Sequence, residues 1–352
     1  MNGVSITGHT GLTCLLGSPV AHSVSPAMHN ESFRYHGLDY VYLAFDVPPE
    51  EFETAVDGLI VMNARGWNCT MPHKRSMFER VNIRSKEAEL IGAVNTVVQE
   101  NGVLTGYNTD GKGYMRAVED AGFHIIGKKM TILGTGGAAA SIIAQAALDG
   151  VSAVDVIARK GHSWGETEKV VNRVNAATDC KIQMFELADE VQMRKSIGES
   201  GILVNASSVG MSPHEDDCLV PDPGFLHPEL IVSDVIYNPR KTKLLSMAES
   251  VGCPFFNGMY MLLYQGAYAF TLWTGKEMPI GLVKEKYFTQ IIPGGTTHET
   301  NIWTGAKRNG YGRGKAEDLR AHCSRDERNY PGKSGRDQQT SSGSSRMACG
   351  FL

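Results

Sequence analysis

The chain has 352 residues, of which 42% are hydrophobic and 20% are charged, and its formal net charge is -4. This length allows two domains with cores of their own, at roughly 100 to 200 residues per domain. The composition is that of a soluble globular protein, and the charge gives no reason to expect nucleic acid or an anionic membrane as a partner.

Seven cysteines lie at scattered spacings, without a CxxC pair. The odd count and the spacing argue against a disulfide framework and against a zinc site, and they indicate a reducing compartment. No segment approaches the ~18 to 20 consecutive apolar residues of a membrane span, and no secretory leader pattern opens the chain. We therefore expect a cytoplasmic protein that needs no metal.

Short apolar runs alternate with amphipathic stretches from residue 12 to about residue 113. The runs 40–47 and 96–98 are typical of strands, and the stretches 26–35 and 50–64 have helical spacing. This alternation predicts a mainly parallel sheet that is covered by helices on both faces.

Two hydroxyl residues precede the first predicted helix, which we expect to begin at Pro26. Ser23 and Ser25 are one residue apart, and hydroxyls at a helix N-terminus can bind a small carboxylate. Ordinary N-capping by Ser25 is the alternative.

A lysine and a carboxylate each close a polar motif at a predicted strand-to-helix junction. These residues are Lys74 and Asp110, and such junctions collect ligand-contacting side chains in α/β sheets. A lysine in a cleft beside a carboxylate can exchange a proton with a substrate. Pro72 can occupy the first turn of a helix, which would place Thr70 and Lys74 on neighbouring turns. The alternative for a lone lysine is a solvated surface position.

A glycine-rich turn follows the buried strand 130–133 and precedes the alanine-rich helix 138–148. In this context Gly134 permits the tight turn, Gly136 lets the backbone approach a pyrophosphate, and Ala139 allows close helix packing. A turn with nothing bound is the alternative. Further strands at 154–158, 182–185, 202–205 and 231–235, with helices at 166–177 and 189–196, complete a doubly wound βαβ series.

The end of the strand 154–158 carries basic residues where an NAD-specific protein would carry an acid. Arg159 and Lys160 follow this strand, and Asp155 lies too early, inside it. Basic residues here favour the 2′-phosphate of NADP, so we expect NADP or NAD with NADP preferred. The alternative is a solvated loop.

After residue 257 a long apolar stretch, 259–273, has helical spacing and is expected to return to the first domain. The predicted domains are an α/β substrate domain of residues 1–113 plus 258–292 and a Rossmann-type nucleotide domain of residues 114–257. Residues 293–352 lack apolar periodicity and are expected to be a disordered tail, either appended sequence unrelated to the fold or a basic arm.

Eight motifs occur in an order that resembles the shikimate dehydrogenase family, and within it the quinate/shikimate dehydrogenase branch. They cover roughly residues 12–290. The motifs are Ser-x-Ser-Pro (23–26), Asn-x-Thr-x-Pro-x-Lys (68–74), Gly-Ala-Val-Asn-Thr (92–96), Asn-Thr-Asp-Gly (108–111), Gly-x-Gly-Gly-Ala (134–138), Asn-Ala-Ser-x-x-Gly-Met (205–211), Asp-Val-x-Tyr-x-Pro-x-x-Thr (234–242) and Asn-Gly-x-x-Met-Leu-x-x-Gln (257–265).

The resemblance implies a role for each motif. Lys74 and Asp110 would form the catalytic pair, and Ser23, Ser25 and Tyr42 would bind the substrate carboxylate. The resemblance implies further residues for the substrate hydroxyls and the cofactor. These are Thr70, Asn95, Asp110 and Gln265 for the hydroxyls, and Gly137, Ala138, Asn205, Ser207, Met211, Tyr237 and Gly258 for the cofactor. One departure, Gly161-His162-Ser163 where that branch often has an acidic residue, leaves the cofactor preference open.

The resemblance implies interconversion of 3-dehydroshikimate and shikimate, and also of 3-dehydroquinate and quinate, by a nicotinamide-dependent enzyme. A homodimer is one candidate for the oligomeric state, which the sequence leaves open. Two alternatives remain, a same-fold dehydrogenase for quinate or an aminoshikimate and a non-catalytic protein that binds a nucleotide or hydroxy acid. Lys74 and Asp110 speak against the second, because a pure binder needs no proton-exchange pair.

Overall fold

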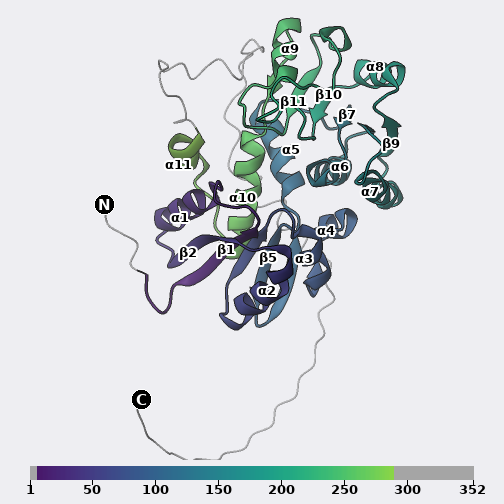
Figure 1. Cartoon of the computed structure of the whole chain (residues 1–352). Helices are drawn as coiled ribbons and strands as arrows, with labels where there is room; N and C mark the ends of the chain where they lie inside the picture. Colours follow the sequence, from purple (N-terminus) through teal and green to yellow (C-terminus); the bar gives the residue numbers. More distant parts are fainter. Residues whose placement is uncertain (1–5, 289–352) are drawn as a thin grey trace, which may run out of the picture. The chain divides into compact units, whose positions relative to one another are not determined.

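The computed structural model describes residues 6–288, and the predicted tail 293–352 lies outside them. Within this range the chain forms two six-stranded sheets, each with helices packed on it (Figure 1). The α/β class expected from the alternating apolar runs is confirmed.

The first sheet has the strand order β2-β1-β3-β5-β6-β4. Its strands are β1 (Gly11–Gly17), β2 (Tyr40–Asp46), β3 (Gly66–Cys69), β4 (Ile83–Arg84), β5 (Thr96–Glu100) and β6 (Val103–Tyr107). Strand β1 pairs in parallel with β2 and β3, but β5 is antiparallel to both of its neighbours. Five of the six strands therefore run in the same direction and β5 is reversed, as expected for a mainly parallel sheet.

A two-residue hairpin explains the antiparallel part. Asn101 and Gly102 connect β5 to β6 with φ values of 51° and 80°, and positive φ at both central residues is the mark of the turn that suits a tight hairpin. The dipeptide Asn-Gly was a readable signal for this turn.

Helices of the first part connect and cover these strands. They are α1 (Ser25–Tyr35), α2 (Phe52–Val61) after the short turn η1 (Pro49–Glu51), α3 (Lys74–Arg80), α4 (Lys86–Ile91) and α5 (Asp110–Asp120). Helix α3 begins at Lys74 with His73 as its N-cap, so Pro72 precedes the helix. The expected placement of Thr70 and Lys74 on neighbouring helical turns is therefore wrong.

The second sheet is wholly parallel, with the order β12-β11-β10-β7-β8-β9. Its strands are β7 (Lys129–Leu133), β8 (Ala153–Ala158), β9 (Lys181–Glu186), β10 (Ile202–Asn205), β11 (Ile231–Asp234) and β12 (Phe255–Phe256), and its helices are α6 (Gly137–Asp149), α7 (Trp164–Ala177), α8 (Glu190–Gly198) and α9 (Lys243–Val251), with the turn η2 (Pro223–Phe225). The order reverses between β7 and β10. That switch point is where open α/β sheets bind ligands, at the carboxyl ends of the strands.

The chain then returns to the first sheet, as the apolar stretch predicted. Helix α10 (Met259–Thr274) carries Trp273, whose indole Nε1 donates to the carbonyl of Val97 on β5 at 2.9 Å. Gly66 makes room for this indole, because a Cβ there would lie 2.3 Å from Nε1 of Trp273. The described chain ends with α11 (Ile280–Val283) and η3 (Lys284–Phe288). Helix α10 thus closes the first sheet after the second has been completed.

Candidate active site

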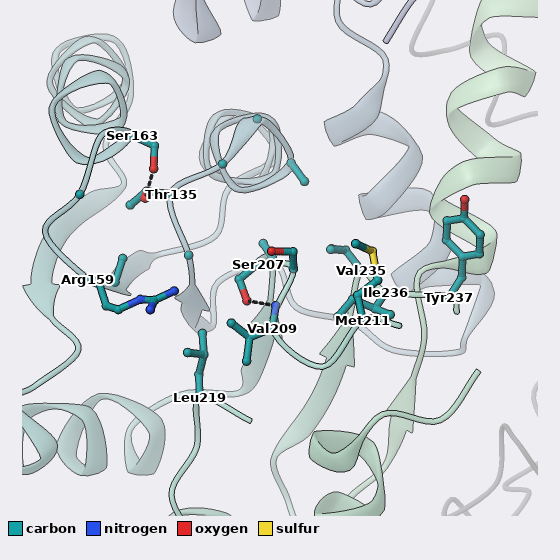
Figure 2. A pocket seen from close by; sticks show the side chains of 18 of the residues that line it. Thr135, Arg159, Ser163, Ser207, Val209, Met211, Leu219, Val235, Ile236 and Tyr237 are labelled. Atoms are coloured by element: carbon teal, nitrogen blue, oxygen red, sulfur yellow. Dashed lines mark hydrogen bonds between the residues drawn. The ribbon is translucent and has the colours of Figure 1, made fainter. Parts of the chain in front are cut away.

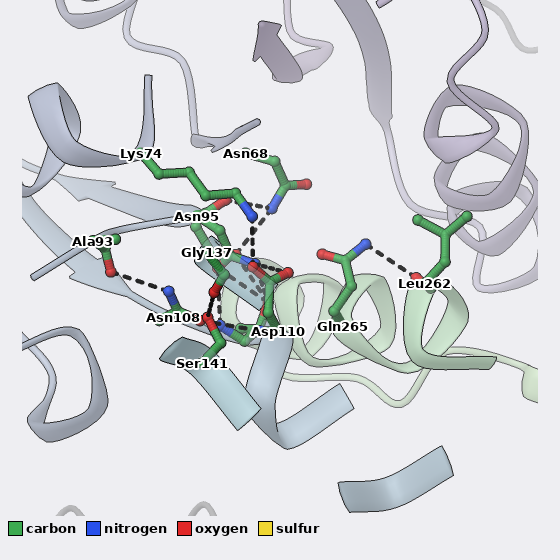
Figure 3. A network of polar contacts seen from close by, with 12 residues as sticks. Asn68, Lys74, Ala93, Asn95, Asn108, Asp110, Gly137, Ser141, Leu262 and Gln265 are labelled. Carbon is green, nitrogen blue, oxygen red and sulfur yellow. Dashed lines mark hydrogen bonds and ion pairs between the residues drawn. The ribbon is translucent and has the colours of Figure 1, made fainter. Parts of the chain in front are cut away.

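A lysine–carboxylate pair lies at the ends of two strands of the first sheet. Lys74 is the first residue of α3, after β3, and Asp110 is the first residue of α5, after β6. Although they are 36 residues apart, Nζ of Lys74 lies 2.5 Å from Oδ2 of Asp110 (Figure 3). Their side chains are 29% and 12% exposed. The pair is therefore largely enclosed but still open on one side to a ligand.

Asn95 holds the second oxygen of the same carboxylate. Its Nδ2 donates to Oδ1 of Asp110 at 2.9 Å, and its Oδ1 accepts from the backbone N–H of Thr109 at 2.8 Å. Because both carboxylate oxygens are engaged, the carboxylate cannot rotate without breaking a hydrogen bond. The position at the N-terminus of α5 also suits a negative charge.

A buried amide that the sequence interpretation left without a role extends this network. Asn68 accepts from the Tyr42 hydroxyl at 2.7 Å and donates to the Asn95 carbonyl at 3.1 Å and to Oγ1 of Thr96 at 2.9 Å. The available signal was a polar residue inside a buried strand, because a buried amide needs partners. The network runs from Tyr42 through Asn68 and Asn95 to Asp110.

The two serines lie at the start of α1, which begins at Ser25 rather than Pro26. The N-cap is Val24, which makes no side-chain cap, so N-capping by Ser25 is wrong. Instead the backbone N–H of Ser25 donates to Oγ of Ser23 at 3.2 Å, and the Ser25 side chain lies near the Tyr42 hydroxyl. Burial raises the pKa of Tyr42 well above its ordinary value, so the phenol stays a neutral donor.

Two further predicted substrate residues have different surroundings. Thr70 is half-buried in the loop between β3 and α3. Gln265 lies on α10, and its Nε2 donates to the Leu262 carbonyl at 3.0 Å, while its amide oxygen is turned toward Asp110 in Figure 3. The Gln265 side chain makes no other hydrogen bond to residues 6–288.

A pocket of about 1420 Å³ lies where β7, β8, β10 and β11 end (Figure 2). Nine predicted cofactor residues line it, namely Gly134, Gly136, Gly137, Ala138, Arg159, Lys160, Ser207, Met211 and Tyr237. Its volume exceeds the roughly 300 to 1,000 Å³ of ordinary small-ligand pockets. The size and the position fit a dinucleotide.

Three predicted cofactor residues support the pocket without lining it. Ala139 is fully buried in the core around α6. Gly258 packs against the backbone just after β11, because a Cβ there would lie 1.9 Å from the Val235 carbonyl oxygen. Asn205 is buried and donates to the Val209 carbonyl and to Oδ1 of Asp234, each at 3.1 Å. Asn205 thus shapes the loop that carries the lining residue Ser207.

The glycine turn has the backbone that a phosphate cradle requires. Gly134 has a φ of 115°, a region that favours glycine. Gly136 is the N-cap of α6 and supplies no side-chain cap, so the first backbone N–H groups of this helix remain free for an anion. These residues fit a pyrophosphate.

Pairing of hydroxyl groups, which the sequence interpretation missed, fixes this turn. Oγ1 of Thr135 lies 2.7 Å from Oγ of Ser163, and Thr167 donates to the Thr135 carbonyl at 2.8 Å. Figure 2 shows the first contact and, below it, the Arg159 side chain extending into the pocket. The pairing ties the glycine turn to the start of α7.

A buried carboxylate, Asp234, organises the other side of the pocket. It accepts hydrogen bonds from Thr242 at 2.7 Å, from the Ile236 N–H at 3.0 Å and from Asn205. Burial raises the pKa of Asp234 to about 6, although these hydrogen bonds oppose the shift. Asp234 therefore connects Asn205 on β10 with the segment before α9.

Neither a metal cluster nor a membrane helix was found in the part of the chain that the structure describes. No three His, Cys, Asp or Glu side chains are grouped to hold a metal ion there. No helix in residues 6–288 is long and apolar enough to cross a membrane.

Two family models match this chain. Residues 15–97 match the shikimate dehydrogenase substrate binding domain, and residues 258–286 match the shikimate 5′-dehydrogenase C-terminal domain. A relative from Listeria monocytogenes, shikimate dehydrogenase (NADP(+)), is 54% identical over 283 residues, which cover 80% of this chain and 97% of the relative. A relative of the same description from Alkaliphilus metalliredigens is 44% identical and covers 79% and 96%.

Solved structures agree with these matches. Shikimate 5-dehydrogenase from Listeria monocytogenes, in complex with shikimate and NAD, has a TM-score of 0.78 at 54% identity, covering 80% of this chain and 97% of that one. Quinate dehydrogenase from Corynebacterium glutamicum, in complex with NAD, has a TM-score of 0.72 at 26% identity, covering 79% and 99%. The two-domain Rossmann fold expected from the sequence is confirmed.

Proposed function

This chain belongs to the shikimate dehydrogenase family, and from that premise we propose that it interconverts 3-dehydroshikimate and shikimate with NADP or NAD. The observation that carries the proposal is the hydrogen-bonded pair of Lys74 and Asp110. A pair of this kind can accept a proton from an alcohol and return it to a ketone.

Each member of the pair has its own part in the reaction. Nζ of Lys74 takes the proton of the ring hydroxyl during oxidation and returns it during reduction. Asp110 keeps the ammonium oriented, and Asn95 keeps Asp110 oriented by holding its second oxygen. Bound nicotinamide supplies the site that accepts or donates hydride.

Substrate binding is proposed for the residues around this pair. Ser23 and Ser25 with Tyr42 bind the carboxylate, and the support is the hydrogen bond between the two serines at the start of α1 and the proximity of Ser25 to the Tyr42 hydroxyl. A carboxylate would compete with Asn68 for the Tyr42 proton. The further contacts to the ring hydroxyls come from Thr70, Asn95, Asp110 and Gln265.

The dinucleotide is proposed to occupy the pocket at the end of β7. Backbone groups of Gly136, Gly137 and Ala138 would hold the pyrophosphate, and Arg159 and Lys160 the adenosine end. Ser207, Met211 and Tyr237 would face the rest of the cofactor. Support comes from the uncapped N-terminus of α6 at this pocket.

The proposed domains follow the two sheets. Residues 1–113 with 258–292 would form the substrate domain, and residues 114–257 the nucleotide domain. In chain order, β6 is the last strand of the first sheet, and after β12 the chain returns to this sheet through α10. This path supports the boundaries. Limited proteolysis would test them.

The test of the activity is the absorbance of reduced nicotinamide after the protein is mixed with shikimate and NADP+ or NAD+. We expect its formation with at least one cofactor. Folded protein that yields no signal with either cofactor would refute the activity, and binding without turnover would favour the non-catalytic alternative.

Quinate is a second candidate substrate, because one similar structure is a quinate dehydrogenase. Shikimate and quinate differ at the ring carbon that carries the carboxylate, so few contacts separate them. Comparing kcat/KM for shikimate, quinate and an aminoshikimate decides among the three.

Two wider properties are also proposed. The cytoplasm is supported by the free cysteines among the described residues, Cys14, Cys69, Cys180, Cys218 and Cys253, which suit a reducing compartment. A homodimer is supported by exposed Leu43 and Phe45 on the edge strand β2. Cell fractionation tests the first and light scattering the second.

A further inference from the structure

The end of β8 carries two cations and no acid, but the next strand supplies a carboxylate. In the parallel pairing of β8 with β9, Ala158 lies opposite Glu186. Oε1 of Glu186 lies 2.5 Å from Nζ of Lys160. The end of β8 has no acid of its own, but Glu186 at the end of β9 lies beside it. Lys160 and Glu186 are 26 positions apart in the sequence.

The two cations of this strand end have different partners. Arg159 and Lys160 both line the pocket. Within residues 6–288, no carboxylate lies within ion-pair distance of Arg159, whereas Lys160 is paired with Glu186. Nζ of Lys160 also lies 5.8 Å from the ring centroid of Trp164. One of the two positive charges is thus offset by the carboxylate.

The pairing of Lys160 with Glu186 is readily exchanged. Their side chains are 63% and 52% exposed, and exposed ion pairs contribute little free energy. A dianionic phosphate can therefore draw the ammonium away from the carboxylate, since charge-assisted bonds to phosphate are strong. A ribose hydroxyl, which carries no charge, cannot compete in this way.

We propose that Glu186 sets the cofactor preference of this chain, an inference that rests on the proposed dehydrogenase function. Glu186 restrains Lys160 and adds a negative charge near the adenosine end, so it weakens binding of a 2′-phosphate. Binding of NAD, whose ribose carries a hydroxyl there, is nearly unaffected. The carboxylate thereby keeps the chain able to use both cofactors, although its strand end is basic.

The test is a set of dissociation constants for adenosine 2′,5′-bisphosphate and for AMP, which differ by the 2′-phosphate alone. Glu186→Gln is expected to lower Kd for the bisphosphate about three- to fivefold, the upper part of the range that loss of one exposed ion pair allows. Kd for AMP should stay within about twofold. Lys160→Met should raise Kd for the bisphosphate about tenfold.

A double-mutant cycle shows whether Glu186 acts through Lys160. In the Lys160→Met background, adding Glu186→Gln should change Kd for the bisphosphate by less than about twofold. Glu199→Gln is the control, because Glu199 is a half-exposed carboxylate that pairs with Lys129 at the start of β7, at the strand ends opposite to the pocket. It should leave both constants unchanged.

The outcomes separate this inference from the proposed function. If the parent binds NADP+ or NAD+ and oxidises shikimate, but Glu186→Gln leaves the bisphosphate-to-AMP ratio unchanged, only the assignment of Glu186 is overturned. The same holds if Glu199→Gln shifts the ratio equally. If the parent binds neither dinucleotide, both the function and this inference fail.

Discussion

Asp234→Asn is expected to stabilise the protein at neutral pH. The carboxylate is fully buried at the end of β11, and burial raises its pKa from 3.8 to about 6. An asparagine resembles the protonated carboxyl group in shape. It can still accept hydrogen bonds from Asn205 and the Ile236 N–H, and its amide can donate to Thr242.

The magnitude follows from the shift in pKa. The folded state keeps the Asp234 proton up to about pH 6, whereas the unfolded chain loses it near pH 4. Stability from this group is therefore fully present below about pH 4 and is lost as the pH rises through about 6. About two pKa units correspond to about 3 kcal/mol. Asp234→Asn should remove this loss.

Urea denaturation of the variant and the parent between about pH 4 and pH 8 measures the effect. The difference in free energy of unfolding should be near zero at the acid end and approach about 3 kcal/mol in favour of the variant above pH 6. Taking the difference cancels other titrating groups. A difference that does not vary with pH, or a variant less stable at pH 7, would show that the ionised carboxylate is well accommodated. Shikimate oxidation should stay within a few-fold, because the pocket loop keeps its hydrogen bonds.

Lys74→Ala should lower kcat by about 10² to 10⁴ while Kd for the cofactor changes little, as stopped-flow and binding assays would show; a kcat within a few-fold of the parent would reduce Lys74 to a binding residue. Ser23→Ala and Ser25→Ala should each raise KM for shikimate about tenfold, the loss of one charged hydrogen bond of about 1.5 kcal/mol, and an unchanged KM in both would move the carboxylate elsewhere. His29 is fully buried, and burial lowers its pKa from 6.5 to about 3. The unfolded chain therefore takes up a proton that the folded chain does not, and the free energy of unfolding falls as the pH drops below about 6.5. The urea midpoint of His29→Leu minus that of the parent should therefore be larger at pH 5 than at pH 7.5. The same difference at both pH values would contradict this.

The sequence by itself determined the elements and the chemistry of this protein. Apolar runs such as 130–133 and helical spacing such as 259–273 depend on local burial and propensity, and both elements form where expected. The glycine turn at 134–138 could be read for the same reason, because a strand, a tight turn and a helix N-terminus are adjacent in the chain.

The tertiary structure decided which distant residues meet. Lys74 and Asp110 pair because β3 and β6 lie on either side of β5 and end at helices that start beside each other. Asn68 gained its role as the link between Tyr42 and Asn95 only when those strands were in register.

The nucleotide pocket shows the same division. Its glycine turn could be read from local sequence, but the place of Glu186 beside Lys160 depends on the register of β8 with β9. Likewise Asn205 donates a hydrogen bond to Asp234 because β10 and β11 are neighbours and place the two residues opposite each other. Local sequence encodes dihedral preference and burial pattern, whereas strand order and register arise from packing of the whole core, and they alone place side chains that lie tens of residues apart within hydrogen-bond distance.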